Sequence, residues 1–162
     1  MNAIIGYSEM LEEEAGDLGQ KEFIPDLKKI QSAGKHLMSL INNILDLSKI
    51  EAGKMDLYLE SFEITPMVNE VASMVKPLVE KNVNHLEVNC SPEIGFMTAD
   101  LTKVRQTLFN LVSNACKFTD RGKVTLGAAR CNDGVRDWIY FKVADTGIGM
   151  SEEQQGRLFE AF

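Results

Sequence analysis

The stretch LFNLVSNACKFT, residues 108–119, decides the fold of this chain. It lies in a longer segment, 101–118, whose apolar spacing predicts a single helix. At about 100° per residue, Asn110, Asn114 and Lys117 fall on one side of that helix. The opposite side is predicted to face a core and carries Leu101, Val104, Leu108, Leu111, Val112 and Ala115.

The polar side needs an explanation, because asparagine is a poor helix former in an exposed helix interior. One interpretation is a solvated surface. The other is a site for phosphate and metal, since amide oxygens are neutral, hard ligands that suit Mg²⁺. In that case the ammonium group of Lys117 would neutralise phosphate charge. The spacing alone leaves both interpretations open.

A second motif, Asp145-Thr146-Gly147-Ile148-Gly149, directly follows a predicted strand. A carboxylate at a strand end can accept a hydrogen bond from an exocyclic amine such as that of adenine. The two glycines allow the backbone to turn and a ligand to approach closely. An ordinary turn is the alternative. The chain has neither the G-x-G-x-x-G fingerprint of dinucleotide folds nor a P-loop.

Outside these motifs, the sequence from residue 54 onward alternates between helix and strand patterns. Asn132-Asp133-Gly134 is a strong turn signal between two strands. Pro66 is expected at the first position of a helix, and Ser151 is expected to cap a last short helix. The predicted strands cover 57–64, 86–88, 96–98, 124–131 and 138–144, and the predicted helices cover 65–81 and 101–118.

The first 53 residues have a helical period, with a break between Gly16 and Gly19 and a long helix predicted over 21–52. Gly53 is expected to end that helix. Its apolar residues alternate at spacings of three and four, which indicates a packing seam: Leu27, Ile30, Gly34, Leu37, Ile41 and Ile44. One hairpin cannot bury this surface. We expect a second copy to complete a four-helix bundle, with packing against the following domain as the alternative.

The composition excludes several functions. The 162 residues include 17 basic and 24 acidic ones, and a net charge of −7 disfavours a nucleic acid or an anionic membrane as partner. No apolar run approaches the about 20 residues of a transmembrane helix, and the N-terminus lacks the basic region of a signal peptide. Cys90, Cys116 and Cys131 form no C-x-x-C pair, which favours reduced thiols in a cytosol.

Taken together, these motifs resemble those of sensor histidine kinases of two-component systems. Residues 108–119 resemble the N box of that family, 145–149 its first glycine box and 158–162 its F box. Residues 1–7 resemble the segment after the phospho-acceptor motif, and 45–53 resemble the end of the second dimerisation helix. The motifs follow one another in the order and spacing of the family.

The resemblance implies an α+β protein with two domains. Residues 1–53 would form the dimerisation and phospho-acceptor hairpin of a homodimer, and 54–162 an incomplete Bergerat-type α/β sandwich that binds ATP and Mg²⁺. The parent enzyme would transfer the γ-phosphoryl group of ATP to a histidine and then to an aspartate of a response regulator. It would work in the cytoplasm, with any membrane anchor lying upstream.

The resemblance also implies roles for individual residues. Asn114 would bind Mg²⁺, with Asn110 and Lys117 near the phosphates. Asp145 would bind the adenine amino group, and Phe118 would pack near the base or ribose or else belong to the core. The nucleotide-binding set that it implies is Asn110, Asn114, Lys117, Phe118, Asp145, Gly147 and Gly149.

One position separates kinases from ATP hydrolases of the gyrase class within this resemblance. The hydrolases carry a glutamate one turn before the metal-binding asparagine, where this chain has Asn110. A carboxamide cannot act as a general base near neutral pH. The sequence therefore favours phosphoryl transfer over hydrolysis.

The family's phospho-acceptor histidine is expected upstream of Met1, and its ATP lid and second glycine box beyond Phe162. His36 lies mid-way along the second predicted helix, where we expect a packing or surface role, and His85 opens a predicted strand as a surface residue, so neither replaces that histidine. The chain alone is therefore expected to be inactive in self-phosphorylation. An inactive dimerisation module, pairing with itself or with a full-length kinase, is the alternative function.

Overall fold

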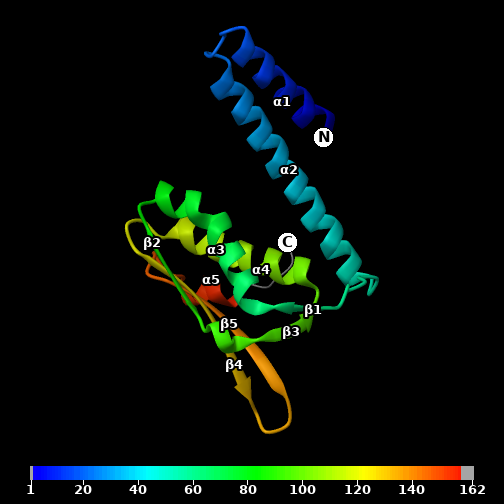
Figure 1. Cartoon of the computed structure of the whole chain (residues 1–162), viewed down its shortest axis with the longest axis vertical. Helices are drawn as coiled ribbons and strands as arrows, with labels where there is room; N and C mark the ends of the chain where they lie inside the picture. Colours follow the sequence, from blue (N-terminus) through cyan, green and yellow to red (C-terminus); the bar gives the residue numbers. More distant parts are fainter. Residues whose placement is uncertain (1, 158–162) are drawn as a thin grey trace. The chain divides into compact units, whose positions relative to one another are not determined.

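The computed structural model describes residues 2–157, apart from the side chains of Ser39, Asn43 and Glu51. The chain divides into two compact units, Met1–Asp56 and Leu57–Phe162, and each is described by itself. Figure 1 shows the first unit in blue and cyan and the second in green to red. Within the described residues, no helix combines the length and apolarity that crossing a bilayer requires.

The first unit is a helical hairpin of α1 (Asn2–Asp17) and α2 (Ile24–Glu51). Gly53 ends α2 as predicted: its φ is +63°, its N–H donates to the Ile50 carbonyl, and the Lys54 N–H donates to the Lys49 carbonyl. This pair of bonds is a Schellman motif, which satisfies carbonyls that the helix end leaves without partners.

Polar contacts fix how the two helices pair. The carboxylate of Glu12 accepts a hydrogen bond from Gln31 at 2.7 Å and lies 3.5 Å from the ammonium nitrogen of Lys28. The backbones approach closely at Gly34, where a β-carbon would lie 3.0 Å from the side chain of Ile5. The hairpin therefore has a defined register.

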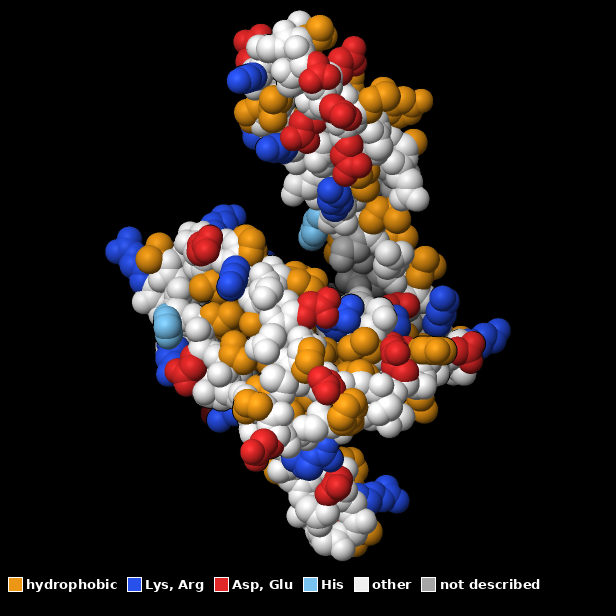
Figure 2. All heavy atoms as spheres, in the orientation of Figure 1, with side chains coloured by type: hydrophobic (Ala, Val, Ile, Leu, Met, Phe, Trp, Pro, Cys, Tyr) orange, Lys and Arg blue, Asp and Glu red, His pale blue; other side chains and the backbone are white. Residues whose placement is uncertain are grey.

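Only part of the predicted packing seam of α2 is buried within the hairpin, and the rest is exposed. Gly34 is buried and Leu27 is half-buried, whereas Ile44 is 64% exposed. Figure 2 shows apolar side chains exposed along the hairpin. The large apolar residues that α1 and α2 leave exposed include Ile4, Tyr7, Met10, Leu11, Ile30, Leu37, Leu40, Ile41, Ile44, Leu45, Leu47 and Ile50.

The second unit contains two small sheets. In one, β1 (Glu60–Glu63) pairs antiparallel with β3 (Phe96–Ala99). In the other, β4 (Lys123–Asn132) lies between β2 (His85–Cys90), to which it is parallel, and β5 (Asp137–Asp145), to which it is antiparallel. The remaining elements are α3 (Ile64–Lys81), the 3₁₀ turn η1 (Pro92–Ile94), α4 (Leu101–Phe118) and α5 (Glu152–Gly156).

The core of this unit lies between the two long helices and the larger sheet. Strand β4 alternates, so that Val124, Leu126 and Ala128 point into the core. The helices meet them with fully buried apolar side chains, namely Val68, Val71 and Val75 of α3 and Val112 of α4. The predicted combination of a helical hairpin with an α/β sandwich is confirmed.

Several local predictions are wrong in informative ways. Leu111 is 50% exposed, because it lies at the edge of the apolar arc of α4, about 100° around the helix from the fully buried Val112. Leu57 and Leu59 are exposed and precede β1, since its partner strand ends at Ala99, one residue before the cap of α4. Pro66 occupies the third helical position, which still lies in the first turn, where no intrahelical N–H bond is lost.

Asp100 begins α4 and also holds the segment before β1. Its carboxylate accepts hydrogen bonds from the backbone N–H groups of Lys103 at 3.0 Å and Tyr58 at 3.1 Å. The bond from Lys103, and then that from Tyr58, lower the pKa of Asp100 below its usual range. The ionised carboxylate of Asp100 therefore caps the amino-terminal end of α4.

This cap predicts an acid-sensitive contribution to stability. Because the pKa of Asp100 is lower in the folded state, its contribution is present above the unfolded value of about 3.9 and is lost as pH falls through the folded value. Asp100→Asn keeps a capping side chain that does not titrate. We expect urea midpoints between about pH 5 and pH 3 to fall more steeply for the wild type than for the variant. Parallel slopes would contradict this.

Candidate functional site

Helix α4 carries the polar face predicted from its sequence. Asn110, Asn114 and Lys117 are all exposed, while Val112 and Ala115 between them are buried. The ammonium nitrogen of Lys117 lies 5.2 Å from the centre of the Phe118 ring, within range of a cation–π contact. The face therefore presents two amides and one cation to solvent in the carboxyl-terminal half of the helix.

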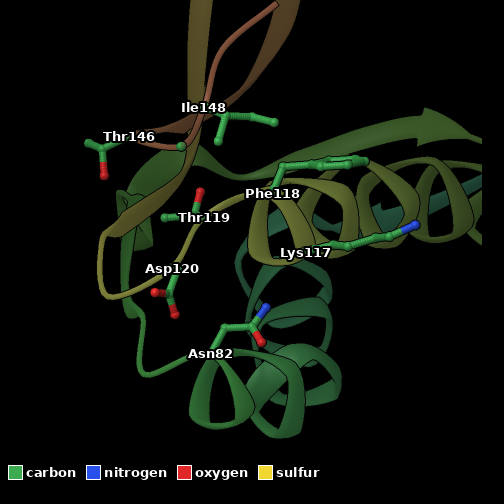
Figure 3. Close-up of a pocket in the computed structure, with 8 residues that line it drawn as sticks. Asn82, Lys117, Phe118, Thr119, Asp120, Thr146 and Ile148 are labelled. Atoms are coloured by element: carbon green, nitrogen blue, oxygen red, sulfur yellow. The ribbon is translucent and has the colours of Figure 1, made fainter.

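A pocket of about 470 Å³ opens beside this end of α4, where the helix meets the loop after β5 (Figure 3). It brings Lys117 and Phe118 together with Gly147 of the glycine motif. The other lining residues are Asn82, Thr119, Asp120, Thr146 and Ile148.

A second pocket of about 400 Å³ adjoins the first and shares Asn82 and Lys117 with it. Asn114 lines this second pocket, together with Leu78, Lys81 and Ser113. Asn110, Asp145 and Gly149 line neither pocket, although all three lie on the segments that border them.

The carboxylate of Asp145 is oriented by the protein at the end of β5. Its Oδ1 accepts a hydrogen bond from the Gly147 N–H at 2.9 Å and one from the Thr119 hydroxyl at 3.5 Å. Thr119 is only 1% exposed, so its hydroxyl is fixed in the interior. Within residues 2–157, the hydrogen bonds to this carboxylate engage Oδ1 alone, which leaves Oδ2 free to accept from a ligand.

The glycine motif touches the end of α4 directly. A β-carbon at Gly147 would overlap the carbonyl oxygen of Phe118 and lie 2.9 Å from Oδ1 of Asp145. The same carbonyl accepts a hydrogen bond from the Ile148 N–H at 3.3 Å. Gly149 has a φ of +68°, a left-handed conformation that favours glycine. The two glycines therefore meet different needs: Gly147 allows a close approach and Gly149 allows a turn.

Five residues that line the first pocket were not among the sequence candidates: Asn82, Thr119, Asp120, Thr146 and Ile148. Thr146 joins the segments: its N–H donates to the Lys123 carbonyl, and its hydroxyl accepts from the Lys123 N–H at 2.9 Å. Asn82 donates to the carbonyl of Cys116 at 2.8 Å. The available signal was a pair of asparagines two residues apart, Asn82 and Asn84, in the short loop between a helix and a strand.

The side chains that border the pockets fit a phosphate-bound Mg²⁺ ion. In the described part of the chain, no hydrogen bond engages the Asn114 side chain, and no group of three His, Cys, Asp or Glu residues could hold a metal by itself. Mg²⁺ usually keeps several waters and binds through one or two protein oxygens, most often of carboxylates, plus substrate phosphates. A single amide oxygen fits that mode. The F box, residues 158–162, lies outside the described residues.

Two family models match the chain. The model of the His Kinase A (phospho-acceptor) domain matches residues 1–53. The model of the Histidine kinase-, DNA gyrase B-, and HSP90-like ATPase matches residues 99–162. The two models therefore follow one another along the chain, the first over the helical hairpin and the second from α4 onward.

Similar proteins include two curated relatives that match over the whole chain. The Non-motile and phage-resistance protein of Caulobacter vibrioides is 42% identical, and the Cell-division control histidine kinase PdhS of Brucella ovis is 29% identical. The chain spans only 19% and 16% of their lengths. Among solved structures, full-length ShkA in complex with AMPPNP has a TM-score of 0.71 and 33% identity, over 85% of this chain and 29% of ShkA.

Proposed function

Since the chain carries the phospho-acceptor and ATPase domains of the histidine kinases and belongs to that family, we propose that it is the central part of a sensor histidine kinase. The longer protein would transfer the γ-phosphoryl group of ATP to a histidine and then to an aspartate of a response-regulator receiver domain. Because the enzyme consumes ATP, we place it in the cytoplasm. The observation that carries the proposal is the meeting of Lys117, Phe118 and Gly147 in one pocket beside Asn114.

In this proposal the glycine loop and the end of α4 bind the nucleoside. Asp145 accepts a hydrogen bond from the adenine amino group through its unused Oδ2, while its Oδ1 remains bound to Gly147 and Thr119. Gly147 and Gly149 shape the loop beneath the base. Phe118, which is half-exposed at the pocket, packs against the base or ribose.

The polar face of α4 binds the phosphates. Asn114 supplies an amide oxygen to Mg²⁺, and Asn110 and Lys117 contact phosphate oxygens directly or through water. The metal would neutralise the charge that spreads over the phosphoryl oxygens during transfer. Asn110 stands where a hydrolase would need a general base, and its amide cannot take a proton from water. Transfer to a protein group is therefore favoured over hydrolysis.

Loss of the two proposed ligands tests this site. Asn114→Ala and Asp145→Ala are each expected to weaken binding of a labelled ATP analogue with Mg²⁺ by about tenfold, because each removes a hydrogen bond or ligand to a charged or buried group. The measurement is a fluorescence titration of the full chain. Asn89→Ala is the matched control, since this exposed asparagine on β2 lines neither pocket and its side chain donates a hydrogen bond to Glu87. Unchanged affinity in both variants would contradict the assignment.

The helical hairpin is proposed to form a homodimer. Its two helices leave apolar stripes exposed while their register is already fixed by polar contacts. A second copy would cover these stripes in a four-helix bundle. This proposal rests on the match to the phospho-acceptor domain and on the amount of apolar surface that one hairpin leaves in water.

A further inference from the structure

Two residues with strained backbone conformations lie in a pair of loops that border the first pocket. In the described chain, the non-glycine residues with positive φ are Val83 at 55° and Arg121 at 49°. For a β-branched residue such as Val83 this conformation is a genuine outlier. Such strain persists only where the surroundings impose it, and it concentrates at functional sites. We call residues 82–84 and 119–122 the paired loops.

The paired loops are joined by both backbone and side chain. The Arg121 N–H donates to the Asn82 carbonyl at 3.0 Å, and the His85 N–H donates to the Gly122 carbonyl at 2.8 Å. A β-carbon at Gly122 would lie 2.5 Å from the side chains of Thr119 and Thr146. The second loop is therefore held between the first loop and the segment after β5.

Among the described side chains of the paired loops, that of Asn84 makes the most hydrogen bonds. Its Nδ2 donates to the carbonyls of Cys116 at 3.1 Å and Thr119 at 2.8 Å, and its Oδ1 accepts from the Gly122 N–H at 3.0 Å. Carbonyls in the last turn of a helix lack intrahelical partners. Asn84 thus ties down the end of α4 from outside the helix.

The segment that Asn84 holds carries the proposed base-binding groups. Lys117 and Phe118 lie between the two carbonyls that it binds. The Phe118 carbonyl accepts a hydrogen bond from the Ile148 N–H, and the Thr119 hydroxyl donates one to Oδ1 of Asp145. Only Thr119 therefore stands between Asn84 and the Asp145 carboxylate.

We infer that Asn84 is a positioning residue for base recognition: it fixes Thr119 and the Phe118 carbonyl, and through them the Asp145 carboxylate and the glycine loop. The inference rests on the proposed function, in which Asp145 binds the adenine amino group. Asn84 itself lines neither pocket, so it acts through its neighbours and not by contact with the ligand.

The experiment measures the preference for adenine over guanine nucleotides in the full chain. ADP and GDP are titrated with Mg²⁺ into the wild type and into Asn84→Ala. We expect ADP binding to weaken about fivefold with little change for GDP, so that the ratio of the two affinities falls. Asp145→Asn should cost less affinity for ADP in the Asn84→Ala background than alone, because coupled residues are not additive.

A second readout needs no nucleotide. Hydrogen exchange at the Gly147 and Ile148 amides, which bond to Asp145 and Phe118, should be faster in Asn84→Ala and unchanged in the control Asn89→Ala. Should Asn84→Ala not fold, Thr119→Val removes only the hydroxyl link to Asp145 and is expected to lower the same affinity ratio.

The outcomes separate the two proposals. A lower melting temperature with wild-type affinity ratio and wild-type amide exchange would overturn the positioning role and leave Asn84 a structural residue. A wild-type chain that binds neither nucleotide would instead overturn the proposed function, and the exchange of Gly147 and Ile148 would then decide alone whether Asn84 holds the glycine loop.

Discussion

Replacing Gly147 with alanine is expected to weaken binding of an ATP analogue with Mg²⁺ by about 10- to 100-fold. The added methyl group would overlap the carbonyl oxygen of Phe118 and crowd Oδ1 of Asp145. Both atoms belong to fixed backbone or to a hydrogen-bonded carboxylate, so the glycine loop has to move away from α4. Overpacking of this kind costs about 1–3 kcal/mol, which corresponds to that loss of affinity if the displaced loop is the one that binds the base.

Gly127→Ala is the matched control for this variant. Gly127 lies in the middle of β4, where a β-carbon would be 3.7 Å from its nearest neighbours, an ordinary contact. The measurement is the same titration, with circular dichroism to show that both variants fold. Equal affinities for Gly147→Ala, Gly127→Ala and the wild type would place the nucleotide away from the glycine loop.

Introducing lysines at Leu37 and Ile44 is expected to convert the proposed dimer into a monomer. Both side chains are exposed on α2, 46% and 64% respectively, and lie on the stripe that a second copy would cover. In a symmetric dimer the double variant would place four ammonium groups in an apolar interface. An unpaired charge removed from water costs several kcal/mol, so dimerisation should be lost at tens of micromolar protein.

Sedimentation velocity measures this change directly. His36→Lys is the control, because it adds the same side chain one residue from Leu37 on an exposed position about 100° away around the helix. We expect the control to sediment as the wild type does. A wild type that sediments as a monomer at the same concentration would contradict the homodimer.

Local signals in the sequence predicted the ends of several elements correctly. Gly53 ends α2 through its left-handed conformation, and Ser151 begins α5 with a complete capping box. The turn at 132–134 joins β4 to β5 as expected. Each of these features depends on one or two residues and their immediate neighbours, which is why a single sequence is enough to predict them.

Tertiary contacts decided what the sequence could not predict. Leu111 belongs to the apolar arc of α4 by spacing, yet it is half-exposed and lies outside the core that Leu108, Val112 and Ala115 join. In the sequence, Asn82 and Asn84 indicate only a polar loop. In the structure, their side-chain amides donate hydrogen bonds to the end of a helix more than 30 residues away in sequence. The left-handed conformation of Val83 had no sequence signal, since a β-branched residue is among the last expected there.

The two ends of the β4–β5 hairpin can be followed by different measurements, because one end carries a tryptophan and the other borders the proposed nucleotide site. The chain's single tryptophan, Trp138, stands beside the turn and bonds to Asp133 at 2.8 Å. Asp145 and Val124 pair at the opposite end, next to the segment 146–148 that lines the proposed nucleotide site. Contacts near the turn are local and form quickly, whereas the pocket also needs the parallel pairing of β2 with β4, which joins distant segments and forms slowly. We therefore expect tryptophan fluorescence to change early in refolding, and binding of a nucleotide at the proposed site to recover later.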